Sequence, residues 1–138
     1  MKQILLQEKF PVFKLEIDKS ETDFSSAQAL TNYFKLLVDE HPVARFIAEF
    51  DHYSHTKGLE GGYIADGIID ARNIIFCFGG KLPAAEMLAM RPRSIGITET
   101  QSSFIISFME APMALANDTM KDWVKSVVRQ SADQRLAS

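Results

Sequence analysis

The chain has 138 residues, of which 46% are hydrophobic and 24% are charged, a balance typical of one ordinary globular domain. Its net charge is −3 and no cluster of Lys and Arg forms a basic stripe, so the composition argues against a nucleic-acid-binding protein. No stretch approaches the roughly 20 apolar residues that a membrane-spanning helix needs, so we expect no contact with a membrane. The single cysteine cannot form an internal disulfide, which favours a reducing cytoplasm.

The first predicted strand covers residues 11–17, where Phe13, Leu15 and Ile17 alternate with polar residues. Strict alternation is typical of a strand with one buried face. Residues 1–7 could pair beside it. The two segments together predict one edge of a sheet.

A helix is predicted after the polar loop at 18–23, because apolar residues recur at spacings of three and four as far as Glu40. Pro42 marks its end, since proline disfavours helical backbone in the residue before it. The predicted core-facing residues are Ala27, Leu30, Phe34, Leu37 and His41. The candidate N-caps are Ser20 and Asp23.

Residues 43–53 alternate again and predict a second long strand. Its core-facing side chains are expected to be Ala44, Phe46, Ala48 and Phe50. The following segment, 54–67, is rich in glycine and predicts a long loop or a loose hairpin.

Residues 71–78 are apolar on both faces from Ile74 onward, which indicates a central strand. The Gly79–Lys81 segment interrupts this strand. A short helix at 83–90 follows, because Pro83 suits the first turn of a helix.

The C-terminal part predicts strands at 94–99 and 103–110 and a last helix at 118–130. Asn117 or Asp118 could cap this helix. The elements then follow the order β-α-β-β-α-β-β-α. We therefore predict an α+β fold in which a mainly antiparallel sheet carries helices on one face. One domain would cover residues 1–130, and residues 131–138 would form a frayed polar tail.

One segment, residues 75–97, carries a more specific pattern. A buried strand ends in glycine, a short helix places Ala84 and Leu88 four residues apart, and Pro92 follows four residues later. Ile95-Gly96-Ile97 then begins the next strand. The pattern resembles the bacterial family catalogued as domain of unknown function 302. The resemblance implies a small α+β protein that forms a homodimer, and it brings no activity to carry over.

The densest cluster of ligand-type side chains is Asp51, His52 and His55, where a strand gives way to the glycine-rich loop. Imidazole and carboxylate groups are common ligands of divalent metals, so a metal site at these three residues is one hypothesis. A second hypothesis makes His52 a general base, held by Asp51 or Asp66. The alternative is a partly buried His52 and a solvated His55 with no role in chemistry. No cofactor is strongly implied.

Two further positions could have a functional role, and each also has a purely structural explanation. Cys77 lies between two phenylalanines, and an apolar strand favours an inert core thiol over a reactive one. Gly79, Gly80 and Lys81 lie between a strand and a helix, where backbone N–H groups and a lysine could bind an anion. The alternative is a tight turn that needs the flexibility of glycine.

A shared pocket is predicted where the 51–67 loop meets the Gly79–Lys81 turn, since loops at strand ends concentrate binding residues. It would gather His52, His55, Tyr63, Asp66, Gly79, Gly80 and Lys81. This holds only if the two loops leave the same edge of the sheet. An antiparallel pairing of the two strands would separate the loops.

Two classes of function remain open from the sequence. The favoured class is a non-enzymatic dimeric module that binds a small anionic ligand or a partner protein, because no complete catalytic constellation can be assembled. The other class is a metal-dependent or acid/base enzyme that uses the cluster at Asp51, His52 and His55.

Overall fold

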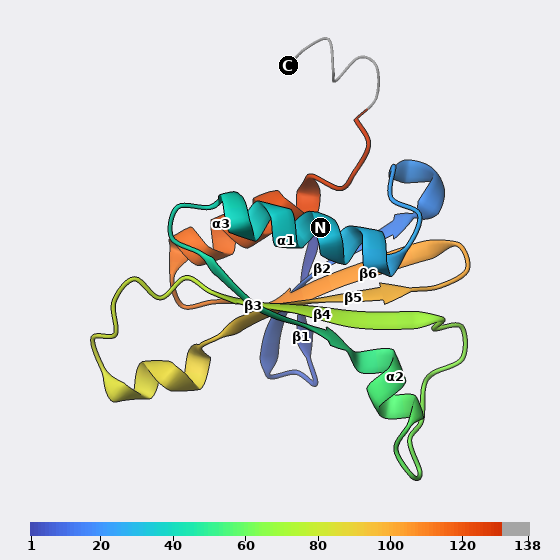
Figure 1. Cartoon of the computed structure of the whole chain (residues 1–138), viewed down its shortest axis with the longest axis horizontal. Helices are drawn as coiled ribbons and strands as arrows, with labels where there is room; N and C mark the ends of the chain where they lie inside the picture. The colour runs from blue at the N-terminus through green and yellow to red at the C-terminus, as the bar shows by residue number, and fades with distance from the viewer. Residues whose placement is uncertain (131–138) are drawn as a thin grey trace.

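The computed structural model describes residues 1–130 as an α+β fold, in which helices pack against a six-stranded antiparallel sheet (Figure 1). The fold class predicted from the sequence is therefore confirmed. The strands are β1 Lys2–Leu6, β2 Phe10–Asp18, β3 Arg45–Asp51, β4 Asp70–Cys77, β5 Arg93–Glu99 and β6 Ser103–Met109. The helices are α1 Ala27–Glu40, α2 His52–Lys57 and α3 Ala114–Lys125, with short 3-10 turns η1 Lys19–Glu21 and η2 Ala85–Met90.

The strand order is β1-β2-β6-β5-β4-β3, and every neighbouring pair is antiparallel. Helix α1 carries the chain from β2 across the sheet to β3 at the opposite edge. The antiparallel pairing follows from short connections such as the turn between β5 and β6. The 131–138 tail predicted to fray lies outside the residues that the structure describes.

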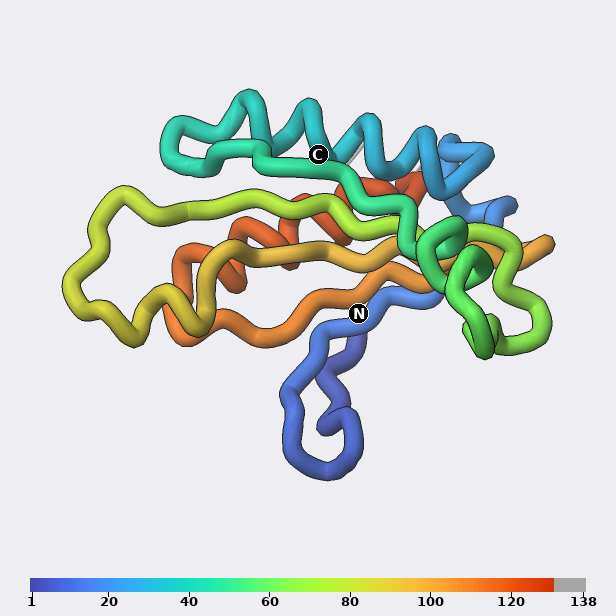
Figure 2. The backbone as a smooth tube through the Cα atoms, turned by 60° about the horizontal axis from the view of Figure 1, so that its bottom comes forward, coloured from blue at the N-terminus to red at the C-terminus, as the bar shows by residue number. Residues whose placement is uncertain are grey.

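The hydrophobic core lies between α1, α3 and one face of the sheet, and both helices are on the same side in Figures 1 and 2. Helix α1 begins after Ser26, whose side chain accepts a hydrogen bond from the Ala29 backbone N–H. Its N-cap is therefore neither Ser20 nor Asp23. Its buried residues are Ala27, Leu30, Thr31, Phe34 and Val38.

The β1–β2 hairpin projects beyond the body of the sheet, as Figure 2 shows. Its outer residues include Leu5, Leu6 and Phe10, which are all exposed. None of the helices within residues 1–130 has the length and hydrophobicity that crossing a bilayer requires.

Strand β3 contains an irregularity that changes the direction of its side chains. Phe46 is paired with Phe76, but the register shifts before Ala48, which is paired with Ile75. Because a shift of one residue reverses the faces of a strand, Phe50 turns away from the helices and is 37% exposed. The prediction that Ala44, Phe46, Ala48 and Phe50 share the core face is therefore wrong for Ala48 and Phe50.

Two predicted boundaries are also wrong. The segment expected to continue the strand and begin a loop forms α2, because the Asp51 carboxylate caps it by accepting from the Ser54 backbone N–H at 3.0 Å. Helix α3 begins at Ala114 and not at 118. The Asn117 side chain does not cap it; it bonds both backbone groups of Ala111, at 2.6 Å each.

Candidate functional site

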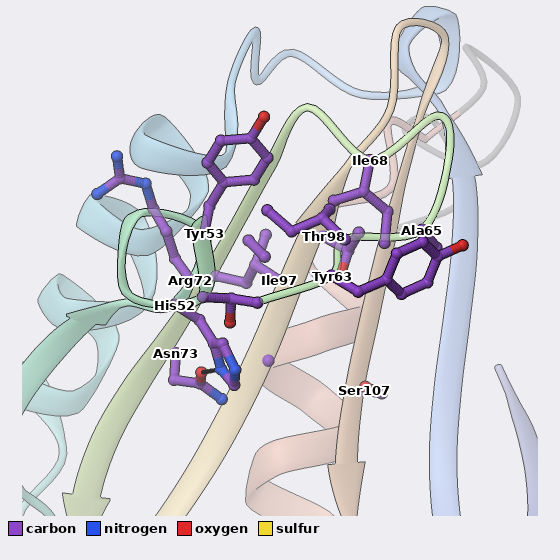
Figure 3. Close-up of a pocket in the computed structure, with 14 residues that line it drawn as sticks. His52, Tyr53, Tyr63, Ala65, Ile68, Arg72, Asn73, Ile97, Thr98 and Ser107 are labelled. Carbon is purple, nitrogen blue, oxygen red and sulfur yellow. Dashed lines mark hydrogen bonds between the residues drawn. The ribbon is translucent and has the colours of Figure 1, made fainter. Parts of the chain in front are cut away.

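A cavity of about 290 Å³ opens on the face of the sheet opposite α1 and α3 (Figure 3). The sheet supplies its floor from β4, β5 and β6. Helix α2 and the loop at 58–69 supply its walls. Its lining residues are His52, Tyr53, Thr56, Tyr63, Ile64, Ala65, Ile68, Ala71, Arg72, Asn73, Gly96, Ile97, Thr98 and Ser107.

Asn73 is the polar centre of the cavity. It lies on β4, where the strand alternation turns its side chain away from the core residue Ile74. Its Oδ1 is 3.2 Å from His52 Nδ1, and its Nδ2 donates to Ser94 Oγ at 3.3 Å. Since an amide oxygen only accepts, His52 Nδ1 donates in this contact, and in the neutral imidazole Nε2 is then the acceptor. The amide thus orients the imidazole and favours this tautomer.

The floor of the cavity is open because β5 carries a glycine there. A Cβ atom built on Gly96 would meet Asn73 Nδ2 at 3.6 Å, Ser107 O at 3.7 Å and Ser107 Oγ at 3.8 Å. These are ordinary van der Waals distances, so a larger residue would fit without strain but would occupy the cavity. Glycine at this position therefore keeps space free in the cavity, although the backbone conformation does not require a glycine.

The walls are apolar and aromatic. Ile64 and Ile68 come from the loop, and Tyr53 comes from α2. Tyr63 is 78% exposed at the rim of the cavity (Figure 3). An exposed aromatic ring beside a polar floor is a common feature of small-molecule sites.

Arg72 alone carries a formal charge among the described residues that line the cavity, and its guanidinium is already neutralised. It forms ion pairs with Asp70 at 2.9 Å, Glu49 at 3.0 Å and Asp51 at 3.7 Å. The hydrogen bond that Arg72 Nε donates to the Asp70 carboxylate raises the pKa of Arg72 above its ordinary value. The cavity is therefore lined by hydrogen-bonding groups without a free charge.

Some of the site residues predicted from the sequence line this cavity, and others lie outside it. His52 and Tyr63 line the cavity. His55 lies further along α2, where its ring packs against Phe50 with centroids 5.2 Å apart, and Asp66 is exposed in the loop. Neither contributes to the lining.

The metal hypothesis gains no support from the positions of Asp51, His52 and His55. Within residues 1–130, no group of three or more His, Cys, Asp or Glu is placed to hold a metal ion. Both carboxylate oxygens of Asp51 accept hydrogen bonds from Ser54, which lower the pKa of Asp51. Its first role is to cap α2. A metal at this cluster stays a prediction.

The prediction of one shared pocket is wrong because of the strand directions. Strands β3 and β4 are antiparallel, with Asp51 opposite Arg72 and Arg45 opposite Cys77. Five residues at about 3.4 Å each, roughly 17 Å of strand, therefore separate the start of α2 from the end of β4. Figure 1 shows α2 and the turn after β4 at opposite ends of the sheet, so Gly79, Gly80 and Lys81 cannot join His52.

Cys77 was predicted to be a core residue, and this is also corrected. The alternation of β4 buries Ile74 and Phe76 and turns Cys77 to the opposite face, where it is partly exposed. Its Sγ accepts a hydrogen bond from the Gly79 backbone N–H at 3.2 Å. The thiol therefore helps to form the turn after β4.

Asn73, Gly96 and Ser107 were missed as site residues. Each is a small or polar residue at a position that alternation assigns to the face away from the helices. That shared pattern was the available signal. Its meaning depended on the strand order, because β4, β5 and β6 are adjacent only in the fold.

The chain belongs to a family of unknown function, DUF6858, whose family model matches residues 1–129. This finding corrects the resemblance to domain of unknown function 302: the helix and glycine spacing shared with that family reflects a similar local pattern and not membership. No curated protein and no solved structure shows a significant match to the chain. The function must therefore be argued from the site itself.

Proposed function

We propose that this member of the DUF6858 family is a binding module that takes a small, neutral, planar molecule into the cavity beside α2. The observation that carries the proposal is the lining: His52, Asn73, Thr98 and Ser107 offer hydrogen bonds, while no free charge faces the ligand among the described residues. Concave sites with a few convergent polar groups on an apolar wall are the usual form of small-molecule sites.

The ligand is proposed to be neutral because the cavity offers nothing to compensate a charge. A carboxylate or ammonium group would lose hydration without gaining an ion-pair partner, which is costly. Arg72 is committed to Glu49, Asp51 and Asp70. The small anionic ligand expected from Lys81 has no counterpart in this cavity, since Lys81 lies at the other end of the sheet.

The ligand is proposed to be planar because aromatic rings border an open floor. Tyr63 and His52 (Figure 3) line the same cavity as Gly96. Aromatic side chains pack well against flat rings, in offset or edge-on arrangements. The amide of Asn73 and the hydroxyl of Ser107 then provide a donor and an acceptor for one edge of the ligand.

A binding role is favoured over acid/base catalysis by the partner of His52. The Nδ1 atom of His52 faces the neutral amide of Asn73 and not a carboxylate. A neutral amide oxygen stabilises the imidazolium that a general base forms less than a carboxylate does. The arrangement is suited to holding a hydrogen-bonding ligand.

The proposal includes a homodimer in a reducing cytoplasm. A shallow surface near the hairpin exposes Leu6, Met90 and Met109 beside Val12. Burying such apolar surface against a second copy would contribute to a dimer, since grouped exposed apolar residues often mark interfaces. The partly exposed thiol of Cys77 fits a compartment in which cysteines stay reduced.

The proposal can be tested with benzamide, a planar neutral amide, added to the ¹⁵N-labelled protein. The backbone amide signals of Asn73, Gly96 and Ser107 are expected to shift in a saturable manner. Benzoate tests the requirement for neutrality and cyclohexanecarboxamide tests the requirement for planarity, and both are expected to bind more weakly. Equal shifts with benzoate, or shifts confined to residues outside the cavity, would contradict the proposal.

A further inference from the structure

A second cavity, of about 430 Å³, lies at the end of the sheet far from α2. It is enclosed by the turn after β4, by η2 and by the start of α3, which are grouped on the left side of Figure 1. Its lining residues are Val43, Phe78, Gly80, Lys81, Pro83, Met87, Arg91, Met113, Leu115 and Ala116. Apart from Lys81 and Arg91, the lining is apolar or glycine.

The surroundings of this cavity expose apolar side chains. Leu82 is 58% exposed and Leu88 is 63% exposed, and Leu115 on the cavity wall is exposed as well. A smaller apolar hollow shares Phe78 and Met87 with it, so the apolar surface continues inward below η2. Such a continuous apolar surface gains free energy when an apolar group covers it.

The two cations at this cavity differ from the paired cations elsewhere in the fold. Lys19, Arg72 and Arg129 each form an ion pair with a carboxylate. Within residues 1–130, no Asp or Glu oxygen lies within 4.0 Å of the charged group of Lys81 or Arg91.

The hydrogen bonds of Arg91 leave part of its donor capacity unused. Its Nη1 donates to the Lys81 carbonyl, and its Nη2 is 4.0 Å from Met113 Sδ. A guanidinium has five N–H donors, so several remain for an anion. These contacts hold the guanidinium at the cavity without neutralising it.

From this combination we infer that the cavity binds an amphipathic carboxylate, a molecule with an unbranched apolar tail and one anionic head. The tail would cover Phe78, Met87 and Leu115, while the head would lie against Arg91 and Lys81. Guanidinium groups match the geometry of carboxylates and bind them through two parallel hydrogen bonds. This site is separate from the cavity beside α2, and neither proposal depends on the other.

The only tryptophan of the chain reports on this cavity. The Trp123 ring stacks on Phe78, with centroids 5.7 Å apart and planes inclined by 19°. Because Phe78 lines the cavity, an occupant that displaces or desolvates this ring alters the emission of Trp123. Binding can therefore be followed without a label.

The experiment titrates the full chain with hexanoate, octanoate and decanoate as monomers and records Trp123 emission. Affinity is expected to rise up to about fourfold for each added methylene, the gain expected when a CH₂ group is buried. Octan-1-ol is the neutral match for octanoate and is expected to bind about tenfold more weakly, because it lacks the charge-assisted bonds.

The variant Arg91→Gln is expected to weaken octanoate binding about tenfold and to leave octan-1-ol binding unchanged. Arg91→Lys retains the charge and is expected to recover part of the affinity. Lys57→Gln, in α2 at the opposite end of the sheet (Figure 1), removes one positive charge away from the cavity and is the matched control. Far-ultraviolet circular dichroism of each variant separates a loss of binding from a loss of fold.

Three results would overturn the inference. Equal binding of octanoate and octan-1-ol, with no effect of Arg91→Gln, would leave an apolar cavity without anion selectivity. A response of Trp123 emission to phosphatidylglycerol vesicles but not to monomeric octanoate would show that this region binds a lipid surface and not a single carboxylate molecule. Octanoate binding that appears only when a dimer dissociates in sedimentation would show that a second copy of the chain covers the cavity.

Discussion

Glu99 connects three parts of the fold through one carboxylate. Its Oε1 accepts from the backbone N–H of Ala27 at 2.8 Å, at the start of α1, and its Oε2 accepts from Lys19 Nζ at 2.7 Å. Its side chain is only 10% exposed. A carboxylate at a helix N-terminus also interacts favourably with the helix dipole. Glu99 therefore anchors α1 to the end of β5.

We predict that Glu99→Ala lowers the free energy of unfolding by about 1–3 kcal/mol, because the Ala27 N–H loses its partner while it stays buried. Glu99→Gln retains an acceptor oxygen and should cost less. Glu16→Ala on the exposed face of β2 is the control and should change stability by less than about 0.5 kcal/mol. Urea unfolding measures all three. Equal losses for Glu99→Ala and Glu16→Ala would refute the anchoring role.

At the scale of single residues, the sequence identified side chains with obvious chemistry and missed those that form the cavity. The sequence pointed to His52 and Tyr63 because imidazole and phenol are chemically functional groups, and both residues line the site. Asn73, Gly96 and Ser107 look unremarkable in isolation. Their importance arises because three strands place them side by side, which no local pattern reveals.

Among the elements, β3 shows how an irregularity defeats a periodic pattern. Alternation predicted that Phe46 and Phe50 face the core together, but the register shift between Phe46 and Ala48 reverses the second half of the strand. A bulge leaves no clear mark in the sequence here. The long helix α1 was foreseen because its apolar spacing extends over several turns. Helix α2, with only His52–Lys57, was too short to show a period.

The strand register leads to a prediction that compares two apolar residues. Ile106 is fully buried in β6, so Ile106→Ala should lower the free energy of unfolding by about 2–5 kcal/mol. Phe50→Ala should cost clearly less, because its ring is 37% exposed and packs against the exposed rings of His52 and His55. Thermal or urea unfolding distinguishes them. A larger loss of unfolding free energy for Phe50→Ala than for Ile106→Ala would show that Phe50 faces the core.

The cap of α2 leads to a pH prediction. Hydrogen bonds from Ser54 lower the pKa of Asp51 in the folded protein below its unfolded value of about 3.9. A lowered pKa means that the contribution of Asp51 to stability is present above that unfolded value and is lost as the pH falls through the folded pKa.

The chemical shift of the Ser54 amide proton should therefore titrate with a midpoint below about 3.9. Asp51→Asn should abolish this titration while an amide oxygen still accepts the hydrogen bond. A midpoint at or above 3.9 would show that the carboxylate does not hold the cap.

For the whole molecule, the sequence foresaw the class of the fold but not which loops meet. Closely spaced strands such as β5 and β6 predict antiparallel pairs, and amphipathic helices predict a covered face. Which loops lie at the same end of the sheet depends on pairing between segments that are distant in the sequence, such as β2 with β6. The result is two separate cavities, one beside α2 and one beside the Gly79–Lys81 turn.

The proposed homodimer is a prediction at the same scale. Apolar side chains at the hairpin, Leu6, Phe10 and Met109 among them, are exposed and would be buried by a second copy. Sedimentation velocity at micromolar concentration should show a species of twice 15.5 kDa. Leu6→Lys should shift the distribution toward the monomer. A single 15.5 kDa species for the unaltered chain would contradict the dimer.

The central claim is that the space above Gly96 is a ligand site, and two matched glycine variants test it most directly. Gly96→Ala and Gly80→Ala each add one methyl group at an ordinary contact distance, but only the first lies on the floor of the cavity beside α2. Gly96→Ala should leave stability unchanged or raise it by about 0.5–1 kcal/mol, since alanine suits a strand better than glycine.

The decisive measurement is the dissociation constant of benzamide for the unaltered protein and for both variants, by titration of amide chemical shifts. Gly96→Ala is predicted to weaken binding about tenfold or more, as one misplaced methyl group does in a fitted pocket, while Gly80→Ala leaves it unchanged. Equal benzamide affinity in all three folded proteins would show that this cavity is not the site.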